Sequence, residues 1–499
     1  MVNNFDNSQQ ASVEISQVQS QDSEQEKKGG MGVLFCVLTL ISIRVSGGVI
    51  GISYAAEHIG FTLMFILQAL YLPLGVLSCW MLLRAKDITG RASFSDLGIY
   101  SYGKAGIYIF NFLIALGNLG FVIIFLIVFG DISSNLLQRL GVDENSFWTT
   151  RLCTQGSLSI ILLYLMLQKE IHNLRYVGLV QLCICLIFLV SFLIHSIKRD
   201  KPPTFDFDIA KTDIDVRFFA VLPTLFTSHG FQAAYFTAFS SLKNKTNRNG
   251  MLADFFGRLS ILVIFNVTIF IAAALYGDEI KKNLLKSIST EDGILPALLE
   301  TTFLFVPALA IPVIFFLGKE GALIIFDELT RKSYSKQNLV KQNKESSNSE
   351  MQDLENVANS EGRRDSKANS ESDQANDTPS ENPDASDKIS EVRIINPKEY
   401  LNMKGVYYYI ITITCYVVVL TLSITVQDVT FFFGVAGSTL GSFSLWIGPG
   451  SFYILSVHKE KVKLESKLEK FTYVSSFAYV IFGFMCLFGL NTFVILNKF

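Results

Sequence analysis

Apolar segments long enough to cross a lipid bilayer recur along the whole chain, and they limit its fold more than any other feature. A membrane-spanning helix needs about 20 mostly apolar residues, because the hydrocarbon core of a bilayer is about 30 Å thick. The 499-residue chain is 50% hydrophobic, and only 17% of its residues are charged. This pattern excludes a soluble enzyme with a single anchor and predicts an all-α polytopic membrane protein. We expect eleven transmembrane helices, at residues 33–58, 61–84, 106–138, 152–168, 175–197, 217–240, 257–277, 296–325, 405–426, 430–457 and 471–497.

Polar segments divide the chain into four parts. Residues 1–30 are polar and have no apolar core, so they predict a disordered cytosolic tail and not a signal peptide. Residues 31–330 hold the first eight spans, and 398–499 hold the last three. The segment between them, 331–397, is dense in Ser, Asn, Asp, Glu and Lys and predicts a disordered cytosolic insertion. It is either a phosphorylated regulatory segment or a tolerated insertion without a role of its own.

Charge and residue spacing exclude several classes of function. The excess of Lys and Arg beside alternate span ends predicts a cytosolic N-terminus. The net charge of −2 indicates no nucleic-acid partner. The spacing of the seven cysteines is typical of neither a zinc site nor a disulfide framework, so we expect no metal and no cofactor. No catalytic triad or carboxylate pair shares one membrane depth, so we expect a protein that is not an enzyme.

The first and sixth spans are both interrupted. The first contains Ser46-Gly47-Gly48 near its middle, together with Arg44. Glycine disfavours helix, and a charge at membrane depth costs about 2.5–3.5 kcal/mol on insertion scales. The segment is therefore either a helix broken around a binding site or a helix that small residues allow to pack closely. The sixth span contains Pro223 followed by 227–230. Two interrupted helices five spans apart favour the binding site, since this arrangement marks the midplane site of many transporters.

Specific residues follow from these two interruptions. We predict substrate contacts from Ser46, Gly47, Gly48, Val49, Thr227, Ser228, His229 and Gly230, and an ion-coupling role for Ser42, Arg44 and His229.

Two of these residues, and the tenth span, leave alternatives open. Arg44 pairs with a substrate carboxylate or an acidic side chain, snorkels to the interface, or lies outside a misplaced span boundary. His229 either relays protons or is a neutral histidine bonded to a neighbouring carbonyl. In the tenth span, the glycines predict the close approach of another helix. They are Gly434, Gly437, Gly441 and Gly448.

Four segments together resemble the amino acid/auxin permease family, which contains the neutral and the proton-coupled amino acid transporters. Ser42 to Ala55 is similar to the family's first-span motif Asn-x-x-x-Gly-x-Gly-Ile-Leu-x-Leu-Pro-x-Ala. Asp96 to Gly106 resembles the loop before the third span. Phe226 to Tyr235 and Phe433 to Tyr453 resemble the sixth-span and tenth-span motifs.

This resemblance implies a LeuT-type fold, with two inverted five-helix repeats and one extra helix. It also implies secondary active transport of amino acids by alternating access, with substrate held at the two interruptions. The family's first-span Asn falls at Ser42, and the eighth-span Thr of sodium-coupled members falls at Phe305. Because these changes remove oxygen ligands, they favour H⁺ coupling or uncoupled transport over Na⁺ coupling.

The expected partners are an amino acid substrate and the lipid bilayer, with the protein acting as a monomer. The expected membrane is the plasma membrane or that of the lysosome or vacuole. A second function stays open: an amino acid sensor that resembles a transporter and signals through 331–397 with little flux. The substituted motif positions and the long insertion favour this alternative.

Overall fold

The described part of the chain is helical. The computed structural model describes residues 32–169, 175–198, 216–230, 232–240, 242–281, 283–291, 293–336, 399–426 and 429–496. These residues contain no β-strand, which confirms the all-α prediction. Two compact units are present, Met1–Ile325 with Lys404–Phe499 and, separately, Phe326–Met403. The predicted tail 1–30 lies outside the described residues, as does the predicted insertion 331–397 after residue 336.

Each predicted span coincides with a helix or an interrupted helix. The helices are α2 (Val33–Ile59), α3 (Phe61–Thr89), α5 (Lys104–Arg139), α6 (Arg151–Met166), α7 (Arg175–Lys198), α8 (Val216–His229) with α9 (Gln232–Ser240), α10 (Asn247–Tyr276), α12 (Ile294–Arg331), α14 (Gly405–Thr425), α15 (Val429–Ala436) continuing to α16 (Gly448–Lys459), and α17 (Lys467–Leu496). Within the described residues, eight helices are long and apolar enough to cross a membrane, and the bent α2 makes nine. The number eleven stays a prediction, because α6 is short and α8 and α9 are each less than a span.

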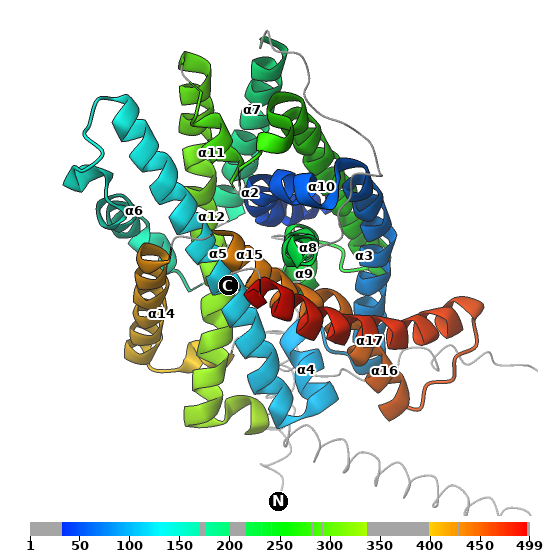
Figure 1. Ribbon diagram of the computed structural model, residues 1–499. Coiled ribbons are helices and arrows are strands. Elements are labelled where there is room, and N and C mark those ends of the chain that lie inside the picture. Colours follow the sequence, from blue (N-terminus) through cyan, green and yellow to red (C-terminus); the bar gives the residue numbers. More distant parts are fainter. Residues whose placement is uncertain are drawn as a thin grey trace, which may run out of the picture. The chain divides into compact units, whose positions relative to one another are not determined.

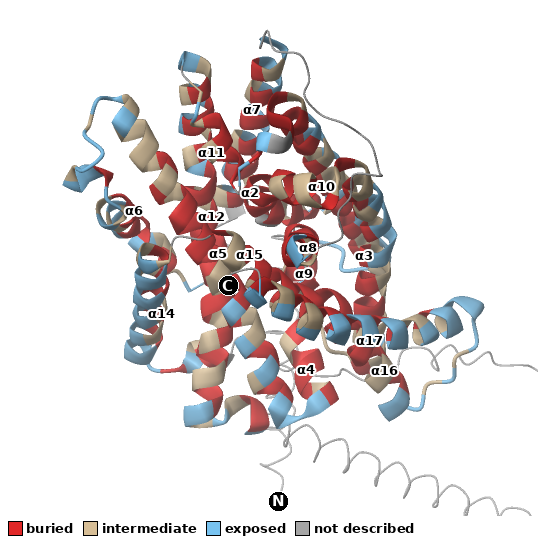
Figure 2. Ribbon diagram, in the orientation of Figure 1, coloured by how far each residue is buried: buried red, intermediate tan, exposed pale blue. Residues whose placement is uncertain are grey.

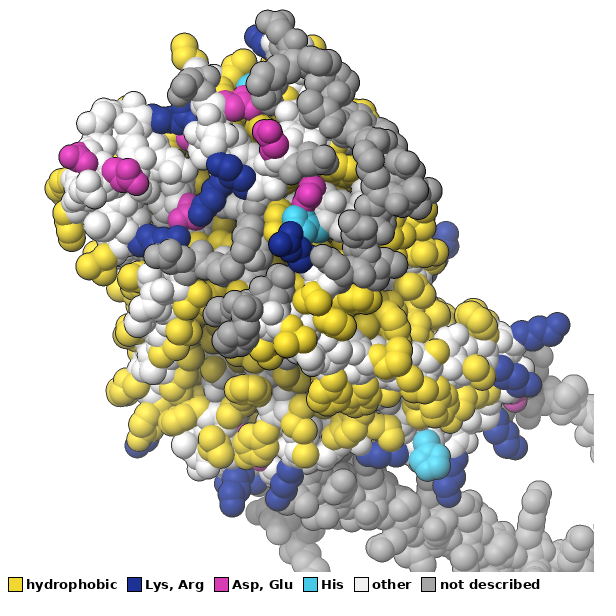
Figure 3. All heavy atoms as spheres, viewed as in Figure 1, with side chains coloured by type: hydrophobic (Ala, Val, Ile, Leu, Met, Phe, Trp, Pro, Cys, Tyr) yellow, Lys and Arg dark blue, Asp and Glu magenta, His cyan; other side chains and the backbone are white. Residues whose placement is uncertain are grey.

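The outer helices expose apolar side chains, whereas the inner ones are buried. Figure 2 shows α2 and α8 largely buried and α14 exposed along one side. Exposed side chains on α17 include Phe471, Val474, Ile481 and Phe488. In Figure 3, hydrophobic side chains gather over α17 and its neighbours, with lysine and arginine side chains at the edges. A continuous apolar surface is unfavourable in water and favourable against lipid.

The buried helix α2 lies beside α10, α8 and α7 (Figure 1). Small residues bring these helices together. A Cβ atom added to Gly257 of α10 would lie 3.5 Å from Leu40 Cβ, and one added to Gly51 of α2 would lie 3.2 Å from Thr224 Cγ2 of α8. The most interrupted stretch of the sequence is therefore at the centre of the helical unit.

The short fourth span ends on a buried lysine. Lys319 of α12 donates from Nζ to the carbonyl oxygens of Met166 (2.7 Å) and Gln168 (2.6 Å). Tyr408 of α14 donates to the same Gln168 oxygen at 2.9 Å. The last carbonyls of a helix have no partner within it, so donors from other helices stabilise its end. Lys319 therefore bonds the carbonyl of the last residue of α6 and one carbonyl just beyond it.

Candidate substrate site

The first span bends at the predicted interruption. Its halves, Val33–Ser42 and Gly47–Ile59, meet at 59°. Helical hydrogen bonding continues across the bend, so the segment is bent and not unwound. Adjacent Ser and Gly residues are a known cause of helix kinks, because both residues have a weaker preference for the helical conformation than alanine or leucine. The change of helix direction lies at residues 43–46, so it overlaps the predicted interruption at Ser46 and comes just before Gly47 and Gly48.

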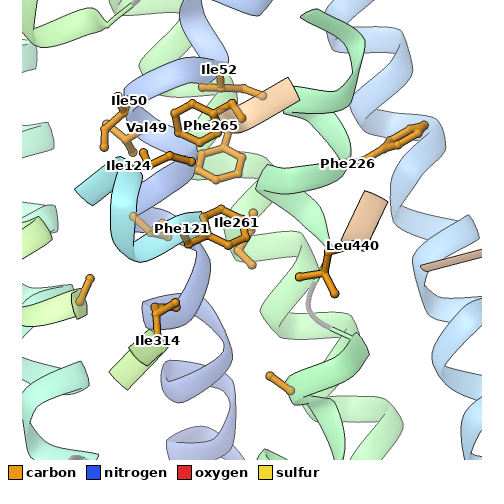
Figure 4. Packing of buried hydrophobic residues seen from close by; sticks show 14 of the residues in the cluster. Val49, Ile50, Ile52, Phe121, Ile124, Phe226, Ile261, Phe265, Ile314 and Leu440 are labelled. Atoms are coloured by element: carbon orange, nitrogen blue, oxygen red, sulfur yellow. The ribbon is translucent and has the colours of Figure 1, made fainter. Parts of the chain in front are cut away.

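The two glycines at the bend lie against aromatic rings. A Cβ atom on Gly47 would lie 3.4 Å from the Phe125 ring of α5, in ordinary contact. A Cβ atom on Gly48 would overlap the ring of Phe265, which projects from α10. Figure 4 shows Phe265 beside Val49 and Ile50 of α2. Close packing by small residues, one of the two interpretations of this stretch, is therefore present together with the bend.

The sixth span is broken where the sequence predicted. α8 contains Pro223 and ends at His229, and α9 begins at Gln232. Gly230 donates its N–H to the Phe226 carbonyl at 2.8 Å, which closes the last turn of α8. Ser228 Oγ donates to the Thr224 carbonyl at 2.8 Å, so this hydroxyl is directed back along its own helix.

The buried His229 lies in a chain of hydrogen bonds. Its Nε2 is 3.2 Å from Gln68 Oε1 of α3, and Gln68 Nε2 donates to Asn266 Oδ1 of α10 at 3.0 Å. Because an amide oxygen only accepts, this arrangement places a proton on His229 Nε2. This contact matches the second alternative for His229, a histidine bonded to a carbonyl.

Aromatic rings enclose the same histidine. The ring centroids of Tyr71 and Phe265 lie 5.1 and 5.3 Å from that of His229. Tyr71 also lies 6.0 Å from Phe226 and from Trp446. Offset and tilted rings at these spacings attract one another beyond their burial of area. These side chains form a rigid wall on one side of the α8–α9 break.

Arg44 is buried beside the bend. Its side chain is 6% exposed, and its guanidinium carbon lies 5.4 Å from the centre of the Phe121 ring. A buried side chain does not snorkel, which removes one alternative. Arg44 Nε has no hydrogen-bond partner among the described residues, and no described carboxylate pairs with the guanidinium. The nearby Ser42 Oγ donates to the Thr39 carbonyl at 2.9 Å, and its own carbonyl accepts from Gln181 Nε2 at 2.9 Å.

The tenth span packs closely against its neighbours, as its glycines predicted. A Cβ atom on Gly437 would overlap the Pro223 carbonyl and Thr227 Oγ1 of α8, and one on Gly434 would lie 2.8 Å from Val494 of α17. Thr227 Oγ1 donates to the Pro223 carbonyl at 2.8 Å. The sequence did not predict the wide turns that follow, where 437–441 and 443–447 are π-helical.

The position compared with the family's eighth-span threonine does not face the site. Phe305 of α12 is 52% exposed, so its side chain points away from the protein interior. Its lack of an oxygen ligand therefore says nothing about an ion site, and this part of the argument against Na⁺ was wrong. Sequence reasoning also missed Gln68, Tyr71 and Phe265, because no motif marks a residue whose partner is on another helix.

This chain resembles one known protein in sequence and another in structure. The amino acid transporter AVT6E of Arabidopsis thaliana is 22% identical over 279 residues, which are 53% of this chain and 56% of that protein. The chain thus matches little more than half the length of this curated relative. Among solved structures, that of MhsT in complex with L-phenylalanine matches with a TM-score of 0.50 at 12% identity, covering 91% of this chain and 98% of that one. This likeness confirms the LeuT-type fold.

The whole helical part of the chain also fits one family description. The profile of the family described as "Transmembrane amino acid transporter protein" matches residues 29–496. The match covers all the segments on which the resemblance was based, and it confirms a multi-pass membrane protein. The chain belongs to the family of transmembrane amino acid transporter proteins.

Proposed function

We propose that this protein is a secondary transporter that moves amino acids across a membrane by alternating access. The observation that carries the proposal is that two interrupted helices touch each other. α2 bends at residues 43–46, α8 ends at His229, and Gly51 of α2 lies against Thr224 of α8. The break between α8 and α9 leaves polar backbone at membrane depth, where a substrate can supply the hydrogen-bond partner, and the bend of α2 brings the first span beside it.

Arg44 supports an amino acid as the substrate. A buried guanidinium without a carboxylate partner is costly, because desolvation of the charge is not offset by an ion pair. The carboxylate that every amino acid carries would supply that partner, in a charge-assisted hydrogen bond. We propose that Arg44 holds the substrate carboxylate and that the aromatic wall of Tyr71 and Phe265 lies along the substrate side chain.

We further propose that transport is coupled to protons or uncoupled. Support comes from Ser42, which replaces the family's first-span Asn and so lacks the amide oxygen of that residue. A Na⁺ ion prefers several free oxygen ligands, and this residue offers few.

Purified protein in liposomes tests the proposal. Uptake of a panel of labelled amino acids is measured with sodium and pH gradients imposed separately, against empty liposomes. We expect saturable uptake that a sodium gradient does not drive. Binding of an amino acid without uptake or exchange would refute the transporter hypothesis and favour the sensor hypothesis. Uptake driven only by sodium would overturn the coupling.

A further inference from the structure

A buried ion pair lies within α10, one turn apart on the same face. Arg258 Nε donates to both carboxylate oxygens of Asp254, at 3.0 and 3.1 Å. The Asp254 side chain is fully buried, and that of Arg258 is 3% exposed. The motifs did not include these residues, and the predicted span 257–277 placed Arg258 at its very start. It lies well inside the helix, whose first residue is Asn247.

The neighbouring helix α3 is shaped around this pair. Arg258 Nη2 donates to Cys79 Sγ at 3.4 Å. A Cβ atom on Gly75 would overlap the guanidinium, so the missing side chain leaves the space that the guanidinium fills. The ion pair is therefore an integral part of the packing between α3 and α10 and not a surface ion pair.

The first half of α2 lies over the same region of α10. Leu40 of α2 packs against Gly257, the residue before Arg258. Cys36 Sγ donates to the Ala238 carbonyl of α9 at 3.5 Å. This half ends at the 59° bend, so a rotation there would lift Leu40 and Cys36 from α10 and α9 and admit water to the ion pair. Access of water to Asp254 would then depend on the position of the first half of α2.

We propose that Asp254 is the residue that binds the coupling proton, and that Arg258 sets when it does so. This inference rests on the proposed transport function and names its coupling residue. One proton from water on one side adds to a carboxylate oxygen and forms an O–H bond. The same proton leaves to water on the other side, and no other bond changes. Arg258 keeps its own proton throughout.

The charge of the pair explains how the proton would act on the helices. With Asp254 ionised, the pair is neutral and tolerates a dry environment. With Asp254 protonated, the charge of the buried Arg258 is no longer balanced by the Asp254 carboxylate. Its desolvation then favours the arrangement in which the first half of α2 is lifted and water reaches the guanidinium. Protonation and helix movement are thereby linked in one equilibrium.

Other ionisable groups face the pair from five helices, α2, α3, α8, α9 and α17. Those that interact with Asp254 are Cys36 of α2, Cys79 of α3 and Tyr235 of α9. Those that interact with Arg258 include Arg44, Tyr71, His229 and Tyr479. Asp254 is the only carboxylate in this group of described residues. The thiols and phenols ordinarily lose their protons above neutral pH, and arginine keeps its own. Of His229 and Asp254, which remain, it is the carboxylate that is ion-paired with Arg258, so its protonation changes the charge of the pair.

Buried charges in membrane helices are expensive and are commonly part of ion pathways. An ion pair kept only for stability would be replaceable, since apolar residues of similar volume often stabilise a protein as well or better. The double variant Asp254→Leu/Arg258→Met therefore separates the two roles. It removes both charges of the pair together, so that neither is left buried without the other.

The experiment compares proton-driven accumulation with exchange in liposomes. Exchange of labelled for unlabelled amino acid needs no net proton movement, whereas accumulation against a gradient does. For Asp254→Asn and for the double variant, we expect accumulation driven by a pH gradient to fall at least about tenfold, and exchange to stay within about threefold of wild type. Proton entry with substrate is measured with a pH-sensitive dye inside the liposomes.

Gly75→Ala provides a second test that retains both charged residues. The added methyl group displaces the guanidinium, which removes a cation from beside the carboxylate and favours its protonated form. We expect the pH midpoint of proton-driven accumulation to move to higher pH. Gly156→Ala in α6 is the matched control, because a Cβ atom there would meet nothing within 4 Å.

The outcomes separate the two proposals. Wild-type protein that neither exchanges nor accumulates amino acids refutes the transport function itself. Wild-type protein that exchanges amino acids without moving protons overturns the coupling role of Asp254 and leaves transport intact. Full proton-driven accumulation by Asp254→Asn, or an unchanged pH midpoint in Gly75→Ala, overturns it equally.

Discussion

The ring of Phe265 occupies the place where a side chain on Gly48 would lie. Gly48 lies just after the bend of α2, and Phe265 lies on α10. The contact forms because Gly48 has no side chain and the Phe265 ring fills the space. The same ring lies 5.3 Å from the ring of His229, at the end of α8. Phe265 therefore touches both interruptions of the proposed substrate site.

Gly48→Ala tests this contact. The added methyl group overlaps the Phe265 ring, so we expect the free energy of unfolding to fall by about 1–3 kcal/mol, as in other overpacked cores. The companion change Phe265→Leu removes the overlap, and we expect the double variant to recover most of the loss. Thermal unfolding in detergent measures all three. Additive losses in the double variant would show that the two residues do not act on each other.

The hydrogen bond between Gln68 and His229 leads to a second prediction. Gln68→Leu removes the acceptor of His229 Nε2 and the donor to Asn266, and so takes these partners from a buried imidazole and a half-buried amide oxygen. We expect a loss of about 1–3 kcal/mol of unfolding free energy, because an unmade buried hydrogen bond carries the full desolvation cost. Gln68→Glu is the informative control, since a carboxylate still accepts from His229. Equal stability of Gln68→Leu and wild type would show that the chain of hydrogen bonds does not stabilise the fold.

Sequence reasoning succeeded where a property is local to one segment. Hydropathy placed the helices, and Ser46-Gly47-Gly48 and Pro223 placed the bend and the break, because each is set by the backbone preferences of neighbouring residues. The tenth-span glycines were correctly assigned to packing for the same reason: small residues at helical spacing leave a groove in any helix.

The residues that were missed act through partners on other helices. Asp254 and Arg258 are four positions apart and pair within α10, yet their burial depends on Gly75 and Cys79 of α3. Arg258 near the predicted start of its span looked like an interfacial cation. The α10 helix begins ten residues before that predicted start, so the charge lies deep. The prediction that compared Phe305 with an ion ligand had a different fault. A motif alignment matches positions along a helix but does not fix which side of the helix faces the site.

Removal of residues 345–390 tests the sensor alternative. The segment lies outside the described residues, and its composition cannot bury a core. If the protein works as a transporter, we expect uptake per molecule to stay within about twofold of wild type, because the helices supply the whole pathway. The measurement is liposome uptake normalised to reconstituted protein. Full amino acid binding with loss of all cellular response would instead support signalling through 331–397.

Arg44→Met tests the proposed anchor for the substrate carboxylate. Methionine retains much of the side-chain volume and loses the charge, so the free energy of unfolding should remain unchanged or rise, since a buried cation without an ion pair is removed. Loss of one charge-assisted hydrogen bond should raise KM for the amino acid by at least about tenfold, with a smaller effect on kcat. Arg84→Met is the matched control. Arg84 pairs with Glu469 where both side chains are partly exposed, so its loss should change stability by less than about 1 kcal/mol and leave KM unaltered. Decarboxylated amines give a second readout: wild type should discriminate strongly against them, and Arg44→Met should not. If Arg44→Met retains both the wild-type KM and this discrimination, another group holds the carboxylate.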